Sequence, residues 1–128
     1  MEQDISQAEL VVMKLLWDES PLTAKQINAQ IQAQHIEKQW RKATVKTLIN
    51  RLLKKGFIDF EQQGRRYLYR PTVKKSSYLA TQNNRFLKDL YDGQLSHMLA
   101  AFSHHEKLTE AEIKEIKVLI ANLEKSHE

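Results

Sequence analysis

The segment Trp40–Gly56, WRKATVKTLINRLLKKG, decides the fold of this chain of 128 residues. Its apolar residues recur at i, i+3, i+4 and i+7, which places on one helical face Val45, Leu48, Ile49 and Leu52. The opposite face is small, polar and basic, and it carries Ala43, Thr47, Asn50 and Lys54, flanked by Lys46 and Arg51. Such a helix is either an ordinary surface helix or one that enters the major groove of DNA, where small residues allow close approach and cations reach phosphates or guanine edges.

Basic residues are concentrated around this segment. Residues 40–75 contain 11 Lys and Arg against 2 Asp and Glu, whereas residues 76–128 contain 6 against 8. This imbalance predicts a surface that binds a polyanion. Membrane-surface binding is the weaker interpretation, because the basic stretch lacks a continuous apolar face with aromatic anchors.

The composition disfavours several other classes of protein. With 41% hydrophobic and 28% charged residues the chain is an ordinary globular protein, and no apolar run approaches the roughly 20 residues that span a bilayer. The N-terminus lacks the order of a signal peptide, so we expect a cytoplasmic protein without membrane insertion. The absence of cysteine excludes disulfides and thiolate metal sites. The sequence contains no glycine-rich phosphate loop, no paired carboxylates on one face and no nucleophile elbow, so neither an enzyme nor a cofactor is expected.

The segments upstream of Trp40 predict two further helices. The capping-box spacing of Ser6 and Glu9 begins a helix that runs to about Asp18, with Trp17 in the core. A second capping box at residues 23–26 begins a short helix, and a polar link around residues 35–39 leads into the third. Gly56, preceded by two lysines, ends that third helix.

A basic β-hairpin is predicted to follow. Residues 57–60 and 66–70 form aromatic-rich strands around a polar turn at residues 61–65, so Arg65 and Arg66 lie at the tip. Three helices followed by such a hairpin is the order of a winged helix-turn-helix, in which the third helix reads the groove and the tip contacts phosphate. Alternatively, the two arginines are solvated turn residues. The winged helix is expected to occupy residues 1–73, which makes the fold mainly α with a small β-hairpin.

The remaining residues, 74–128, predict a helical dimerisation domain. Three amphipathic helices are expected, one ending near residues 91–93, one over residues 95–102 and one after Thr109. So short a region buries its apolar faces poorly alone, whereas a second copy could cover them. A homodimer would also place two recognition helices on a palindromic operator. The residues expected at the dimer interface are Leu95, Leu99, Phe102, Ile116, Leu119, Ile120 and Leu123.

The pattern around the third helix also supports a specific relationship. It reads Trp40-x-x-x-Thr44-Val45-x-Thr47-Leu48-x-x-Arg51-Leu52-x-x-Lys55-Gly56. This resembles the recognition-helix signature of the BlaI/MecI/CopY family of penicillinase, methicillin-resistance and copper-responsive repressors, and the similarity extends over nearly the whole chain. The resemblance implies a homodimeric repressor of operators built on TACA/TGTA inverted repeats. The residues expected to contact DNA are Arg41, Lys42, Ala43, Thr44, Lys46, Thr47, Asn50, Arg51, Lys54, Arg65 and Arg66.

The chain departs from the family pattern at two places. Arg41 and Ala43 stand where relatives often have Ser and Lys, which weakens the N-cap and alters base preference at the edge of the half-site. Ala101 precedes Phe102 where β-lactam-responsive relatives are cleaved between Asn and Phe in response to a sensor protease. Release by cleavage at this bond, with a sensor-linked protease as partner, is therefore an open expectation. Without cysteine, the copper-responsive route is excluded.

Other functions remain as alternatives. A winged-helix regulator could respond to a small molecule, although the C-terminal helices leave little volume for a ligand domain, or to a metal ion bound by His97, His104, His105 and His127. Adjacent histidines rarely face one ion, so no metal site is predicted. The chain could also be a pure interaction protein that uses its C-terminal helices, in which case the basic half is incidental.

Overall fold

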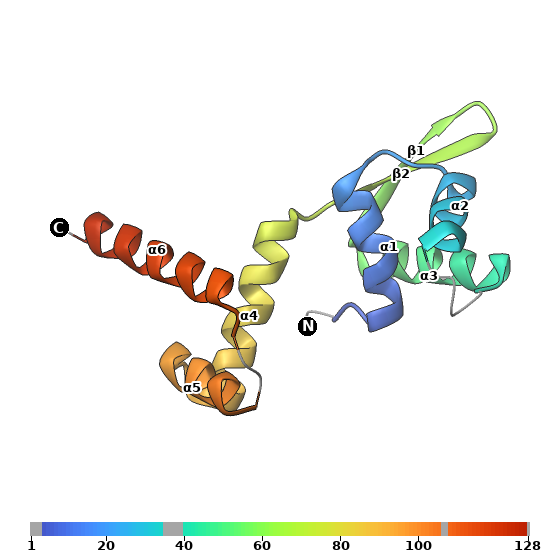
Figure 1. Cartoon of the computed structure of the whole chain (residues 1–128). Helices are drawn as coiled ribbons and strands as arrows, with labels where there is room; N and C mark the ends of the chain where they lie inside the picture. The colour runs from blue at the N-terminus through green and yellow to red at the C-terminus, as the bar shows by residue number, and fades with distance from the viewer. Residues whose placement is uncertain (1–3, 35–39, 106–107, 128) are drawn as a thin grey trace. The chain divides into compact units, whose positions relative to one another are not determined.

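The computed structural model describes residues 4–34, 40–105 and 108–127, and within them it shows six helices and one two-stranded hairpin (Figure 1). The chain divides into two compact units, Met1–Leu79 and Ala80–Glu128. The predicted polar link at residues 35–39 lies outside the described residues. None of the described helices is both long and apolar enough to cross a membrane.

Three helices form the body of the first unit: α1 (Gln7–Asp18), α2 (Ala24–Gln34) and α3 (Lys42–Lys55). The predicted capping boxes begin the first two. The Ser6 hydroxyl accepts the N–H of Glu9 at 3.1 Å, while the Glu9 carboxylate accepts the N–H of Ser6 at 2.8 Å. Thr23 and Gln26 exchange the same two hydrogen bonds at the start of α2. Both starts are confirmed, because a capping box satisfies backbone donors that the first helical turn leaves unpaired.

The end of α3 also follows the prediction. Gly56 adopts the left-handed conformation, with φ of 82°, and its N–H donates to the carbonyl of Leu53. The N–H of Phe57 then returns to the carbonyl of Leu52 at 3.0 Å, so the chain turns sharply into the hairpin. Glycine suits this position because other side chains rarely adopt a positive φ.

One hydrophobic core lies beneath these elements, and Trp17 lies at its edge. The expectation that Trp17 is a core residue is wrong: the ring is only partly buried, and its indole N–H donates to the carbonyl of Val73 at 2.8 Å. Its ring centroid is 5.7 Å from that of Tyr78, which also packs against Phe57 at 6.0 Å. An indole N–H needs a hydrogen-bond partner, and here the partner is at the rim. The buried core consists of Val12, Met13, Leu15, Leu16, Leu22, Ile27, Ile31, Val45, Leu48, Ile49, Leu52, Ile58 and Tyr69.

The hairpin pairs β1 (Ile58–Gln63) with β2 (Arg66–Pro71) in antiparallel register. The predicted five-residue turn at residues 61–65 is wrong, since Gln63 pairs with Arg66 and leaves only two residues between the strands. A run of polar residues indicates a turn, but this stretch of the hairpin is exposed on both faces, so polarity does not end a strand there. Leu22 and Tyr69 exchange backbone hydrogen bonds of 3.0 and 2.8 Å, which attach β2 to the segment between α1 and α2.

The remaining helices are α4 (Lys75–Tyr91), α5 (Leu95–His105) and α6 (Glu110–Ser126). α4 begins in the first unit and continues into the second. The Thr109 hydroxyl caps α6 by accepting the N–H of Glu112 at 3.1 Å, as expected from the sequence. No side chain that the structure describes in these three helices is buried.

Candidate nucleic-acid interface

The third helix has one buried and one exposed face, as its periodicity predicts. Val45 and Ile49 are 1% exposed, and Leu48 and Leu52 are also buried. Burying an aliphatic side chain contributes roughly 1.5–3 kcal/mol, so these contacts fix the rotation of α3 about its axis. Residues on the other side of the helix therefore face solvent.

All the α3 residues expected to contact DNA lie on this exposed side. The Thr47 hydroxyl donates to the carbonyl of Ala43 at 3.0 Å, which holds the side chain along the helix and leaves the oxygen able to accept a further hydrogen bond. The exposed set brought together by the helix is Arg41, Lys42, Ala43, Thr44, Lys46, Thr47, Asn50, Arg51 and Lys54.

The start of α3 bears out the departure at Arg41. This residue occupies the N-cap position with extended backbone, and its side chain makes no capping hydrogen bond. A serine there could accept a backbone N–H of the first turn, whereas arginine has donors alone. The exposed side chain of Arg41 therefore lies at the N-terminal end of α3 without a capping role.

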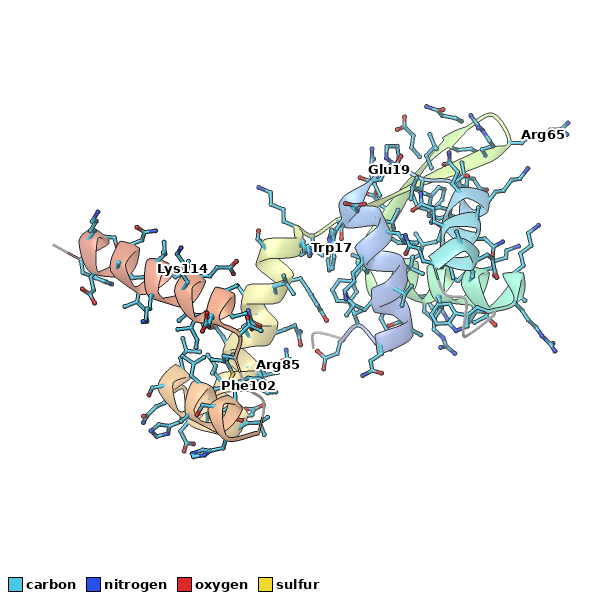
Figure 2. The ribbon with its side chains drawn as sticks, viewed as in Figure 1. Trp17, Glu19, Arg65, Arg85, Phe102 and Lys114 are labelled. Atoms are coloured by element: carbon cyan, nitrogen blue, oxygen red, sulfur yellow. The ribbon has the colours of Figure 1, made fainter. Side chains whose placement is uncertain are left out.

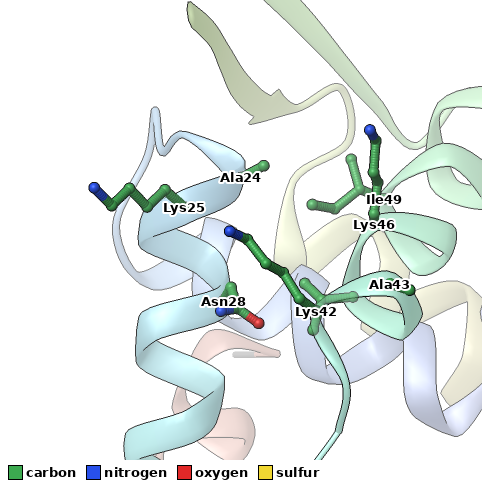
Figure 3. A pocket seen from close by; sticks show the side chains of 8 residues that line it. Ala24, Lys25, Asn28, Lys42, Ala43, Lys46 and Ile49 are labelled. Atoms are coloured by element: carbon green, nitrogen blue, oxygen red, sulfur yellow. The ribbon is translucent and has the colours of Figure 1, made fainter.

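A groove of about 450 Å³ runs between α2 and the first half of α3 (Figure 3). Its lining combines apolar side chains with three lysines: Ala24, Lys25, Asn28, Lys42, Ala43, Val45, Lys46 and Ile49. Figure 3 shows Lys42 reaching from α3 toward α2, near Asn28, while Lys25 points outward from α2. Sequence reasoning missed Lys25 and Asn28. A groove between two helices has no local sequence pattern that could have indicated them.

The hairpin tip carries the two predicted arginines. Arg65 lies in the turn, where Figure 2 shows it pointing away from the helices, and Arg66 is the first residue of β2. Both are exposed. Further down the hairpin, Arg70 contacts Asp59 at 2.8 Å and Glu61 at 3.7 Å. Both acidic residues of the hairpin are thus paired with Arg70.

The residues predicted at a dimer interface lie on α5 and α6, and most of them are exposed. Leu95 is 52% exposed, Leu119 61% and Leu123 60%, which is unusual for leucine in a folded chain. Phe102 and Ile120 are also exposed, while Leu99 and Ile116 are half-buried. No second copy is present, so their part in an interface stays a prediction.

The predicted cleavage bond lies inside a helix, and the described histidines do not gather with other possible metal ligands. The Ala101–Phe102 bond lies inside α5. Where side chains are described, no three His, Asp or Glu residues gather as metal ligands would. The side chain of His105 lies outside the described set.

Comparison with known proteins identifies relatives over most of the chain. A family model described as penicillinase repressor matches residues 5–122. The chain is 31% identical over 112 residues to the penicillinase repressor of Bacillus licheniformis, covering 88% of this chain and 85% of that protein. It is 32% identical over 117 residues to the methicillin resistance regulatory protein MecI of Staphylococcus aureus (strain N315), covering 91% and 93%.

A solved structure extends the likeness to the fold. The solution structure of the B. licheniformis BlaI monomeric form in complex with the blaP half-operator superposes with a TM-score of 0.50 at 31% identity, covering 61% of this chain and 92% of that one. The first unit is thus a winged helix like that of BlaI. Together with the match of the family model, this shows that the chain belongs to the penicillinase repressor family.

Proposed function

We propose that the protein is a transcriptional repressor that binds operator DNA in a sequence-specific manner through α3. The observation that carries the proposal is the fixed rotation of α3, which buries Val45 and Ile49 and presents a face of small, polar and basic residues to solvent. The relative solved in complex with a half-operator supports the same use of this winged helix.

The front of α3 suits the major groove of DNA. Ala43 and Thr47 are small, so the helix backbone can approach the base edges, and alanine or a threonine methyl can contact a thymine methyl. Asn50 can form a bidentate contact with adenine. Each good base contact contributes about 1–3 kcal/mol of discrimination.

The groove beside α3 suits one strand of the DNA backbone. Lys46 and Lys42 lie roughly 60–100° around the helix from Ala43. A helix in the major groove has a phosphodiester backbone on each flank, so these lysines would meet one strand. Lys25 adds a third cation from α2, and the apolar lining suits deoxyribose carbons. We therefore add Lys25 to the phosphate contacts.

The repressor would act as a homodimer on a palindrome of TACA/TGTA type. The exposed leucines of the second unit support this, because water-exposed apolar surface favours association. Two-fold symmetry would then present two copies of α3 to two half-sites.

Release from the operator would follow an inducing signal, with cleavage between Ala101 and Phe102 as the candidate. Because this bond lies in α5, a protease could engage it as extended chain only after local opening of the helix. Mass spectrometry after co-expression with a family sensor protease tests this: cleavage should give a new terminus at Phe102, and an intact chain would refute it.

Operator binding is tested by titrating a TACA/TGTA duplex and a scrambled duplex at two salt concentrations. We expect preference for the repeat and a steep loss of affinity with salt, because binding releases counterions from phosphates. Lys46→Ala should weaken binding, whereas Lys14→Ala, which removes an exposed lysine of α1, should not. Equal binding of both duplexes would refute sequence-specific recognition.

A further inference from the structure

The carboxylate of Glu9 is buried in the winged helix and bound to the last residue of α3. Glu9 is 1% exposed, and its Oε1 accepts the backbone N–H of Ser6 at 2.8 Å. The same oxygen accepts from the Nζ of Lys55 at 2.6 Å. Lys55 also donates to the backbone carbonyl of Asp4 at 3.0 Å. One ammonium thus joins the end of α3 to α1 and to the segment before it.

Because of these partners, the Lys55 side chain has a different environment from that of its neighbour Lys54. The Lys55 side chain is 22% exposed and held at two places, while Lys54 is exposed on the face that carries Asn50. Withdrawing Lys55 toward a phosphate would leave a buried carboxylate without its counter-charge, which is strongly unfavourable. Lys55 is therefore unavailable to DNA although it follows a predicted DNA contact in the sequence.

The pair adds a contact at the end of α3, beyond the last fully buried residue of this helix. The buried residues of α3 end at Leu52, one turn before Lys55. Beyond Leu52, the helix end is held by the partly buried Leu53, by the ion pair to Glu9 and by the turn at Gly56. Lys54 lies in this last part of the helix, and Asn50 lies one turn before it on the same face. A change in the angle of the helix end would therefore displace Lys54 and disturb the proposed base contact of Asn50 next to it.

We infer that Lys55 is a positioning residue for DNA recognition, which acts through Glu9 to hold the C-terminal end of α3 at the angle that the operator requires. The inference rests on the proposed function. The two adjacent lysines then have different roles: Lys54 contacts the phosphate backbone of DNA, and Lys55 aligns the helix.

The test compares Lys55→Met with Lys54→Met in the full chain. Each variant is titrated, at several salt concentrations, with the TACA/TGTA duplex that wild type binds best and with a scrambled duplex. Lys54→Met should weaken binding to both duplexes and reduce the slope of log affinity against log salt by about one. Lys55→Met should keep the wild-type slope and lower the operator-to-scrambled affinity ratio by about fivefold or more, the effect of one weakened base contact.

Two further variants keep the test decisive. Lys55→Arg retains the positive charge and should restore the ratio. Glu9→Met/Lys55→Met removes both charges, so it leaves no unpaired carboxylate and should fold even if Lys55→Met does not, yet still show the lowered ratio. Thermal unfolding identifies which proteins are folded at the titration temperature.

The outcomes separate this inference from the proposed function. A slope reduced by Lys55→Met as by Lys54→Met would overturn it, because Lys55 would then be a phosphate contact. A folded double variant with the wild-type ratio would also overturn it, because the pair would then only stabilise the fold. Failure of wild type to prefer any repeat duplex would instead refute the proposed function.

Discussion

We propose that base recognition depends most on Thr47 and Asn50, because both are exposed on α3 and neither belongs to the core. Thr47→Ala or Asn50→Ala should each reduce discrimination among operator variants by roughly 1–3 kcal/mol. Titration of a panel of base-substituted operators measures this. Relative affinities that stay unchanged across the panel would show that these side chains do not read bases.

Glu9 gives the winged helix a defined response to acid. Burial alone raises the pKa of the Glu9 carboxyl, but the hydrogen bonds from Lys55 and Ser6 and the charge of Lys55 outweigh it and hold the pKa below its ordinary value. A carboxylate with a lowered folded-state pKa stabilises the protein above the unfolded-state pKa, and this contribution is lost as the pH falls through the folded value.

Thermal unfolding of wild type and Glu9→Gln between pH 7 and pH 3 should therefore give converging stabilities. We expect a clear difference at neutral pH that shrinks as the pH falls from the ordinary pKa of a glutamate toward the lowered pKa of Glu9, where the wild-type carboxylate takes up a proton. Asp18→Asn is a matched control because Asp18 is exposed on the same helix. A difference between wild type and Glu9→Gln that does not change with pH would contradict the role of the charge.

Individual residues differ in how far the sequence alone predicts them. The exposed face of α3 could be predicted from the helical periodicity, because a helix that buries Val45 and Leu48 places Thr47 on its solvent-exposed side. Lys55 did not, because its partner Glu9 lies 46 residues away and the capping box already accounted for that glutamate. Lys25 was likewise missed, since a groove between two helices has no local sequence pattern.

At the scale of single elements, the hairpin should contribute affinity but not sequence preference. Arg65→Ala should weaken binding to all duplexes similarly and reduce the salt slope by about one, as expected for the loss of one phosphate contact. The base-substituted panel and a salt series measure both effects. An altered preference at one base pair would instead show that the hairpin enters a groove.

Helix ends were predicted well because each depends on a few neighbouring residues. Ser6, Thr23 and Thr109 cap the helices that they were expected to begin, and Gly56 ends α3. The hairpin was predicted less well, since the pairing that extends β1 to Gln63 depends on hydrogen bonds to another strand. Polar residues in this part of the hairpin indicate exposure to solvent. Because an exposed strand and an exposed turn are both polar, the composition does not show where β1 ends.

At the scale of the whole molecule, the unburied leucines predict that Leu119→Asp yields a monomer with poor operator affinity. A charge in an apolar interface is uncompensated, and a monomer loses the simultaneous binding of two half-sites. Sedimentation measures the state of assembly. Lys114→Asp, at an exposed position about 140° around α6, is the matched control and should leave a dimer. A Leu119→Asp dimer at micromolar concentration would exclude this interface.

The ion pairs of Arg70 also bear on how quickly the repressor finds DNA. Asp59 and Glu61 are the two acidic residues between positions 40 and 75, and Arg70 lies against both. Arg70 thus serves as an internal counterion shared by two carboxylates, which reduces the repulsion between this part of the hairpin and a polyanion. Electrostatic steering chiefly sets association rates. Arg70 thereby influences how often a diffusing repressor is captured by DNA more than how long it remains on its operator.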